Sequence, residues 1–153
     1  MSKLRDHYLF HAGISCFFYL GYGAFTVVLS MYCQDIGMSA SQIAYIVSFA
    51  PLLSIATQPF FGYLADKWQS PRKVSILLSF ANIVCMFIFA ISRNFLILLL
   101  SSGLAVSFMN AVTPLTDRIG VSSPYQFGKI RLWGSVGYAI MAQVSGLLYQ
   151  YIS

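Results

Sequence analysis

The sequence predicts an all-α protein, a polytopic bundle of transmembrane helices. Hydrophobic residues make up 58% of its 153 residues and charged residues only 8%, whereas about a quarter of the residues in a soluble domain are charged. The mean hydropathy is +0.74. The few charges also divide the chain into five uncharged runs, at residues 7–34, 36–65, 74–92, 94–116 and 132–153. Because about 20 apolar residues span the hydrocarbon core of a bilayer, each run predicts one transmembrane helix.

The first two helices are expected at residues 8–34 and 40–66. The first is too long for the apolar part of a cleavable signal peptide, no small-residue cleavage site follows it, and further apolar runs come after it. It therefore predicts a retained span. The second begins after the polar turn QDIGMSAS of residues 34–41.

Three more helices are expected at residues 71–92, 95–119 and 126–152. The third begins with Ser70 as its N-cap and Pro71 at its first helical position, which both residue types favour. The tripeptide SRN precedes the fourth helix, and the turn GVSSPYQ precedes the fifth. Connections this short make consecutive helices antiparallel neighbours, so residues 1–153 are expected to form one compact bundle without a second domain.

Basic residues gather in alternate connections, which predicts the orientation of the chain. Eight of the nine lie before the first helix, between the second and third, and between the fourth and fifth: Lys3, Arg5, Lys67, Arg72, Lys73, Arg118, Lys129 and Arg131. By the positive-inside rule that face is cytoplasmic. We expect a multi-pass protein of the cell membrane (cytoplasmic or plasma membrane) with a cytoplasmic N-terminus. This topology accounts for the net charge of +5, so no nucleic-acid partner is expected.

The sequence offers no cluster of residues for catalysis or metal binding. Cys16, Cys33 and Cys85 lie in or beside apolar runs without C-x-x-C spacing, so they predict neither a zinc site nor a disulfide framework. The acidic residues are four aspartates, and His7 and His11 lie at the N-terminal edge, where they are expected to reach toward the membrane interface. We therefore expect no enzyme, no cofactor and no metal.

Polar side chains follow one face of three predicted helices. Residues three or four apart share a face, and such series occur on the first, fourth and fifth helices: Ser15, Tyr19, Tyr22, Thr26, Ser30 and Cys33; Asn110, Thr113 and Asp117; and Arg131, Ser135, Tyr138 and Ala142. Three polar faces predict the wall of a water-accessible cavity. Alternatively, the hydroxyl and amide groups join helices by hydrogen bonds, and small residues form a packing seam at Ser135, Ala139, Ala142 and Gly146.

Asp117 and Arg131 are the ionisable residues on these faces, and ionisable groups within membrane helices usually face the interior and pair. If the hairpin turns at Ser122–Ser123, the helical rise of 1.5 Å per residue places them roughly 8 and 13 Å from the turn, close enough in height to pair. We expect an inward pair, although the apolar residues directly after Arg131 favour helices that extend past the apolar runs, which would place the pair above the headgroups. The alternative is that Arg131 is a basic flank at the membrane surface.

The segment FGYLADKWQSPRK of residues 61–73 resembles the G-x-x-x-D-[RK]…[RK]-[RK] signature of the major facilitator superfamily. The resemblance implies a gating motif on the cytoplasmic side, made of Gly62, Asp66, Lys67, Arg72 and Lys73. Gly62 permits close helix contact, and Asp66 needs compensation because the helix dipole disfavours a carboxylate at a C-terminus. The turn departs from the signature, since Gln69-Ser70-Pro71 replaces its usual glycine.

A second resemblance joins NAVTPLTD at residues 110–117, FGKIRLWGSVGYA at residues 127–139 and QPFFG at residues 58–62. These segments are similar to the oligosaccharide:proton symporters of the lactose permease group and to phenylpropionate-type permeases. In the sugar symporters an acidic residue and an arginine bind solute hydroxyls, which implies that role for Asp117 and Arg131. The remaining candidate substrate-binding residues are the ring-stacking Tyr138, the small Ser135, the helix-one residues Tyr19, Tyr22 and Gly23, and Asn110 and Thr113 on the face of Asp117.

Members of this family have twelve helices in two six-helix halves, with solute bound between them. The resemblance implies that residues 1–153 are five helices of an incomplete six-helix half, the N-terminal half-bundle, and that a C-terminal half-bundle is missing. It implies a secondary active transporter for a sugar or another small polar solute, working by alternating access in symport with protons. The expected partners are that solute, protons, the lipid bilayer and the missing half.

Two alternatives stay open. An aromatic acid, or another non-sugar solute, would use Arg131 as its counter-ion, with Asp117 close to its carboxylate. Otherwise the chain is a non-transporting structural membrane protein whose charges serve topology alone. Trp68 and Trp133 lie near the expected cytoplasmic interface and are typical of aromatic belt anchors.

Overall fold

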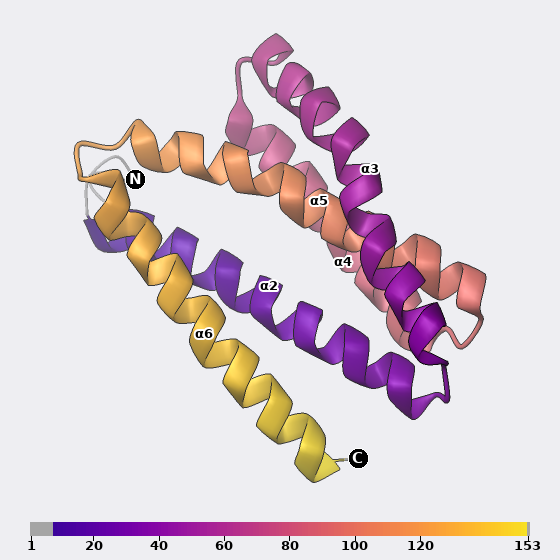
Figure 1. The fold of residues 1–153 in the computed structure, drawn as a ribbon. Coiled ribbons are helices and arrows are strands. Elements are labelled where there is room, and N and C mark those ends of the chain that lie inside the picture. The colour runs from indigo at the N-terminus through magenta and orange to yellow at the C-terminus, as the bar shows by residue number, and fades with distance from the viewer. Residues whose placement is uncertain (1–7, 153) are drawn as a thin grey trace. The chain divides into compact units, whose positions relative to one another are not determined.

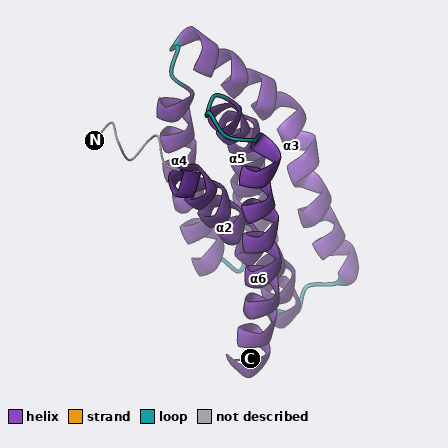
Figure 2. Ribbon diagram, turned by 90° about the vertical axis from the view of Figure 1, so that its left-hand side faces the viewer, coloured by secondary structure: helices purple, strands orange, loops and turns teal. Residues whose placement is uncertain are grey.

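A computed structural model of the protein describes residues 8–152, and these residues form five α-helices joined by short loops (Figure 1). The helices are α2 (Tyr8–Asp35), α3 (Ala40–Lys67), α4 (Pro71–Ile91), α5 (Phe95–Val121) and α6 (Phe127–Ile152). Figure 2 shows no strand among the described residues, so the predicted all-α fold is confirmed. Of the residues named above, Lys3, Arg5, His7 and Ser153 lie outside the described residues.

Each helix begins and ends within two residues of its predicted bounds. At the start of α3, the Ser39 side chain accepts a hydrogen bond from the backbone N–H of Gln42, and the Ser39 N–H donates to Gln42 Oε1 at 2.9 Å. This capping box satisfies two backbone donors that a helix start leaves free. At the start of α4, Pro71 and Ser70 take their predicted positions, although the Ser70 side chain makes no capping hydrogen bond.

The turn between α3 and α4 is a Schellman motif built without glycine. The Gln69 N–H donates to the Asp66 carbonyl at 3.0 Å, and the Ser70 N–H donates to the Ala65 carbonyl at 3.2 Å, the paired pattern of that motif. The motif needs a left-handed residue, which is usually glycine, and here Gln69 has a φ of 47°. The glycine-type turn is therefore kept by a glutamine, at a backbone cost of about 1–2 kcal/mol.

Among residues 8–152, the four helices α2 to α5 are long and apolar enough to cross a membrane. Helix α6 has 26 residues, about 39 Å at the usual rise, which is long enough. Its mean hydropathy is lower than that of the other four helices, because its apolar residues are interrupted by less apolar ones: Gly134, Gly137, Gln143 and Gly146. The chain is a multi-pass membrane protein, and a fifth span at α6 stays a prediction.

The internal contacts divide the chain into two compact units. Unit 2 is residues 32–115, which hold the end of α2, all of α3 and α4, and most of α5. Unit 1 joins the rest of α2 to the last turns of α5, from Thr116 onward, and to α6. A single half-bundle over residues 1–153 stays a prediction.

Within unit 2, α3 and α5 pack closely at Gly103. A Cβ atom on Gly103 would lie 2.6 Å from Cδ1 of Phe49 and 3.3 Å from Cδ1 of Leu53. At the end of α4, the Tyr32 hydroxyl donates to the carbonyl oxygen of Ser92 at 2.9 Å, and its ring lies against Phe89 with centroids 5.3 Å apart. Tyr32 thus satisfies a carbonyl that the helix end leaves free.

A cluster of neutral polar groups also joins α3 to α5. The Asn110 amide donates to Ser54 Oγ at 3.0 Å, and Ser54 Oγ donates to its own-helix carbonyl of Ala50 at 2.9 Å. Ser107 Oγ lies 3.4 Å from Ser54 Oγ and 3.2 Å from Thr57 Oγ1. Ser54 and Ser107 are buried, so this hydroxyl cluster is the interhelical hydrogen bonding that the sequence offered as an alternative use of polar residues.

Within unit 1, α2 and α6 run side by side in the same direction (Figure 1). Their contacts rise together in residue number: Tyr8 with Trp133, Cys16 with Gly137, and Gly23 with Tyr138. A Cβ atom on Gly137 would lie 2.6 Å from the carbonyl oxygen of Cys16, and one on Gly23 would lie 2.8 Å from that of Tyr138. Two glycines therefore allow the helix backbones to touch.

The buried face of α6 differs from the seam that the small residues suggested. Its buried positions are Ile130, Gly134, Gly137 and Ser145. Ser135 and Ala139 are exposed, and no atom lies within 4 Å of a Cβ position on Gly146. The seam of Ser135, Ala139, Ala142 and Gly146 does not form among the described residues. The observed seam is offset by one residue, about 100° around the helix, so the face with Arg131 and Tyr138 remains accessible.

Candidate functional site

The candidate site in unit 1 is built around an ion pair between Asp117 and Arg131. Asp117 lies four residues before the end of α5, and Arg131 lies four residues after the start of α6. Nη1 of Arg131 donates to Oδ2 of Asp117, so the pair that the hairpin geometry predicts is present. Both side chains stay accessible, Arg131 at 43% and Asp117 at 27% of their surface.

An aromatic ring of α2 covers the cation. The guanidinium carbon of Arg131 lies 5.6 Å from the centroid of the Tyr19 ring, within the range of a cation–π interaction. Gly134 makes this approach possible, because a Cβ atom there would lie 2.5 Å from Cδ2 of Tyr19 and 2.8 Å from Oγ of Ser15. Arg131 is therefore held by a carboxylate from α5 and an aromatic face from α2.

Farther along the same two helices, Tyr22 of α2 meets Tyr138 of α6. Their ring centroids are 6.1 Å apart at an interplanar angle of 47°, and Gly23 packs directly on the Tyr138 backbone. Tyr138 is 38% exposed, and Ser135, one turn earlier on its face, is exposed too. Unit 1 thus brings together seven of the nine predicted substrate-binding residues: Asp117, Arg131, Tyr138, Ser135, Tyr19, Tyr22 and Gly23.

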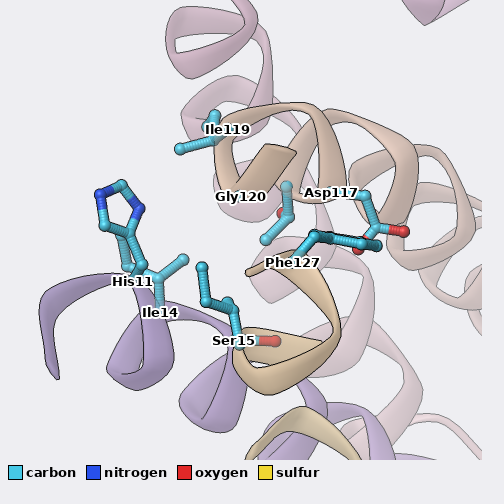
Figure 3. Close-up of a pocket in the computed structure, with 9 residues that line it drawn as sticks. His11, Ile14, Ser15, Asp117, Ile119, Gly120 and Phe127 are labelled. Carbon is cyan, nitrogen blue, oxygen red and sulfur yellow. The ribbon is translucent and has the colours of Figure 1, made fainter. Parts of the chain in front are cut away.

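A small hollow lies beside the carboxylate of Asp117. Figure 3 shows His11, Ile14 and Ser15 of α2 on one side, with side chains of α5 and Phe127 of α6 on the other. The remaining lining residues are Thr116, Ile119, Gly120 and Ile130. The hollow is mostly apolar, so Asp117 and Ser15 are among its few polar contacts.

The other two predicted substrate-binding residues make hydrogen bonds within unit 2. Asn110 belongs to the hydroxyl cluster through its bond to Ser54. Thr113 Oγ1 donates to the carbonyl oxygen of Met109 at 3.1 Å, on its own helix. Their role as substrate ligands stays a prediction.

The predicted gating motif spans the end of α3 and the start of α4. Asp66, Lys67, Arg72 and Lys73 are all exposed. Gly62 makes no close helix contact among the described residues, since no atom lies within 4 Å of its Cβ position. The close contact and the gating role of Gly62 both stay predictions.

The structure adds Tyr8, which the sequence did not single out. Nε1 of Trp133 donates to the Tyr8 hydroxyl at 2.8 Å, so Trp133 has a partner inside the protein besides any interfacial role. The available signal was an aromatic residue in the first turn of one helix and another in the second turn of a later helix, which alone does not predict that they meet. No group of three histidine, cysteine, aspartate or glutamate side chains suited to a metal occurs between Tyr8 and Ile152.

Comparison with known proteins gives a family match and several transporter relatives. The model of the MFS_1 like family matches residues 8–153. The uncharacterized transporter YwbF of Bacillus subtilis strain 168 is 31% identical over 96% of this chain and 39% of its own length. The maltose permease of Geobacillus stearothermophilus is 28% identical over 88% of this chain and 36% of its own length.

A third relative carries a different kind of name. The quinolone resistance protein NorA of Staphylococcus aureus is 33% identical over 69% of this chain and 27% of its own length. No solved structure matches the chain significantly. The chain thus spans less than two fifths of the length of the curated relatives it matches.

Proposed function

Because the chain belongs to the MFS_1 like family, within the major facilitator superfamily, we propose that it forms part of a secondary active transporter for a small polar solute. The proposed solute is a sugar or glycoside, carried by alternating access in symport with protons. Similarity to a protein named maltose permease supports that solute class. This transport activity is proposed for the whole transporter to which these five helices would belong.

One observation carries the proposal, the accessible Asp117–Arg131 pair in helices of a membrane protein. Ionised side chains cost several kcal/mol inside a bilayer and usually mark solute or ion pathways. If these two side chains served packing alone, neutral, buried side chains in their place would stabilise the protein as well or better. An accessible pair can instead exchange part of its mutual bonding for hydroxyl groups of a solute, through charge-assisted hydrogen bonds that are about twice as strong as neutral ones.

The neighbouring side chains suit a sugar. A pyranose has an apolar C–H face, and the exposed ring of Tyr138 offers a flat surface for it, with Tyr22 behind that ring. The exposed Ser135 hydroxyl adds a neutral hydrogen-bonding group on the same face. We assign hydroxyl binding to Asp117 and Arg131, and ring stacking to Tyr138. Asn110 is assigned to packing, because its amide is bonded within the hydroxyl cluster.

The exposed charges of Asp66, Lys67, Arg72 and Lys73 suit a gate at the cytoplasmic face. The Schellman turn at Gln69 holds the ends of α3 and α4 together, so charges from both helices are presented at one short connection. This assignment takes the N-terminus as cytoplasmic, as the distribution of basic residues favours.

The direct test is solute binding by the full-length protein with Arg131→Ala. We expect the affinity for the bound sugar to fall about 100-fold, the equivalent of losing one to two hydrogen bonds to a charged group. Lys129→Ala is the matched control, because it removes an exposed cation two residues away. Purified protein is titrated with maltose, melibiose and raffinose. Unchanged affinity in Arg131→Ala would remove the pair from the binding site.

A second candidate is transport of an aromatic acid. The guanidinium of Arg131 lies over Tyr19, so a planar anion would find both charge and rings, and similarity to a quinolone resistance protein supports a non-sugar solute. The Asp117 carboxylate beside Arg131 disfavours an anion. Competition between maltose and phenylpropionate separates the two candidates. The solute that displaces the other from the protein at the lower concentration is the one that the site binds.

Arg131→Lys distinguishes both candidates from a purely structural protein. Lysine keeps the positive charge but loses the planar fork that bonds two acceptors at once. A transporter should lose at least about tenfold in solute affinity, equivalent to about 1.4 kcal/mol. A structural membrane protein, in which the charge serves topology alone, should insert and function like the wild type.

A further inference from the structure

Tyr8, in the first turn of α2, bonds to residues of α6 on both sides of Arg131. Its hydroxyl donates to the carbonyl oxygen of Lys129 at 3.2 Å and accepts from Nε1 of Trp133 at 2.8 Å. Lys129 and Trp133 are about one helical turn apart, and Arg131 lies midway between them in sequence. A single hydroxyl therefore holds the turn that carries the cation.

The ring of Tyr8 also contacts the loop of the same hairpin. It meets the ring of Tyr125 edge to face, with centroids 5.5 Å apart and an interplanar angle of 75°. Tyr125 lies between α5, which carries Asp117, and α6, which carries Arg131. Tyr8 thus contacts the connection that sets the spacing of the two charged residues.

We propose that Tyr8 is a positioning residue for the Asp117–Arg131 pair, fixing the height and rotation of the start of α6 against α2. The proposal rests on the binding function proposed for that pair. A second contact lies directly after Trp133, where Gly134 packs against Tyr19 and Ser15. Arg131 therefore lies between the Lys129 carbonyl that Tyr8 bonds and the Gly134 contact. Without the Tyr8 hydroxyl, the start of α6 can pivot on Gly134 and carry the guanidinium away from its partners.

The expected size of the effect follows from the bonds involved. Tyr8→Phe keeps the ring against Tyr125 and removes only the hydroxyl, so both hydrogen bonds are lost without a cavity. Trp133 is 43% exposed, so water can replace part of the loss. Interhelical hydrogen bonds in membrane proteins are weak on average, and losing two corresponds to a change of about fivefold to tenfold.

Hydrogen–deuterium exchange of the full-length protein tests the positioning without any solute. In Tyr8→Phe, we expect the backbone amides of residues 129–134 to exchange about fivefold faster than in the wild type. Tyr151→Phe is the matched control, since its ring is 88% exposed on the same helix and its hydroxyl should not affect this turn. Unchanged exchange in Tyr8→Phe would overturn the proposal whichever solute the protein takes.

Measuring the solute affinity and the thermal stability of the same variants distinguishes a Tyr8 that positions the ion pair from a Tyr8 that only stabilises the fold. With maltose as the probe, Tyr8→Phe should raise the Kd of the folded protein about fivefold to tenfold, in addition to the modest fall in Tm that the loss of two hydrogen bonds brings. A purely structural contact would lower the Tm and leave the Kd of the folded protein unchanged, which would overturn the proposal. Lys129→Ala should have neither effect, because the acceptor for Tyr8 is the backbone carbonyl.

Arg131→Ala in the same assay distinguishes the two levels of inference. If Arg131→Ala loses maltose binding and Tyr8→Phe binds like the wild type, the positioning role falls and the proposed function stands. If Arg131→Ala binds like the wild type, the proposed binding site is wrong and the positioning role falls with it. A large loss of maltose affinity in Arg131→Ala with a smaller loss in Tyr8→Phe supports both the proposed function and the positioning role.

Discussion

Units 1 and 2 both carry polar side chains on apolar helices, but the two sets differ in charge and in exposure. The hydroxyl cluster of unit 2 is neutral and enclosed, with Ser54 6% and Ser107 0% exposed. The ion pair of unit 1 is charged and open, with Arg131 43% and Asp117 27% exposed. Neutral hydroxyl and amide groups suffice to join two membrane helices, and charges cost more to desolvate. This contrast supports the proposal that the accessible ion pair binds solute, whereas the enclosed hydroxyl cluster serves packing.

The glycines of the two units differ as well. Gly137 in unit 1 faces a backbone atom, the carbonyl oxygen of Cys16, whereas Gly103 in unit 2 faces the ring of Phe49. A ring can rotate away from an added methyl group, but a helix backbone can yield only by moving the helix. The contact between α2 and α6 is therefore the less tolerant of the two.

The largest predicted effect sharpens this contrast. Gly137→Ala should destabilise the full-length protein by about 1–3 kcal/mol, the usual cost of forcing extra volume into a packed contact. Gly103→Ala should cost less than half as much, because Phe49 can shift. Thermal unfolding in detergent measures both. Gly146→Ala, at a position with free space around its Cβ, is the control and should be neutral. Equal losses of stability in Gly137→Ala and Gly103→Ala would show that the two helix contacts tolerate an added methyl group equally well.

The next prediction tests the division between packing and binding. Asn110→Ala should lower stability by about 1 kcal/mol, because it removes a part-buried hydrogen bond to Ser54. Solute affinity should stay within about twofold of the wild type. Isothermal titration and thermal unfolding give the two quantities on one sample. A loss of affinity as large as that of Arg131→Ala would mean that the hydroxyl cluster belongs to the solute site after all.

The smallest predicted effect compares the turns of the two units. Gln69 in unit 2 holds a left-handed conformation, and it is the one non-glycine residue among residues 8–152 that does so. Gln69→Gly should stabilise the protein by about 0.5 kcal/mol, since glycine removes the strain but loses more entropy on folding. Ser123→Gly, in the turn of unit 1, should give no gain in Tm. A gain at position 123 as large as at 69 would point to a general effect of glycine.

The sequence predicted the helices well because their ends carry strong local signals. Ser70 with Pro71, and the polar connections at residues 34–41 and 120–126, fixed the bounds to within two residues. The pairing of Asp117 with Arg131 was the favoured of two alternatives, because the two residues flank one short turn at similar heights and lie on the polar faces of their helices. These properties depend on residues close together in the chain, which is why periodicity and spacing captured them.

The packing of α2 on α6 could not be predicted in the same way. Two stripes of small residues run along α6, one through Gly134 and Gly137 and one through Ser135 and Ala139. They differ by about 100° of rotation, and only the position of α2 decides between them. The Tyr8–Trp133 hydrogen bond joins residues 125 positions apart, and no local pattern specifies such a pair.

The parallel course of α2 and α6 has a consequence for synthesis. The hydrogen bonds between helices described for unit 2 join residues at most 60 positions apart, as in Tyr32 with Ser92, whereas Tyr8 must wait 125 residues for Trp133. At a synthesis rate of about 5–20 residues per second, that wait is roughly 6 to 25 seconds. During it, the face of α2 around Gly23 has no α6 to pack against, and Asp117 is made before its partner Arg131. Synthesis therefore completes unit 2 before unit 1, and assembly of unit 1 waits for α6.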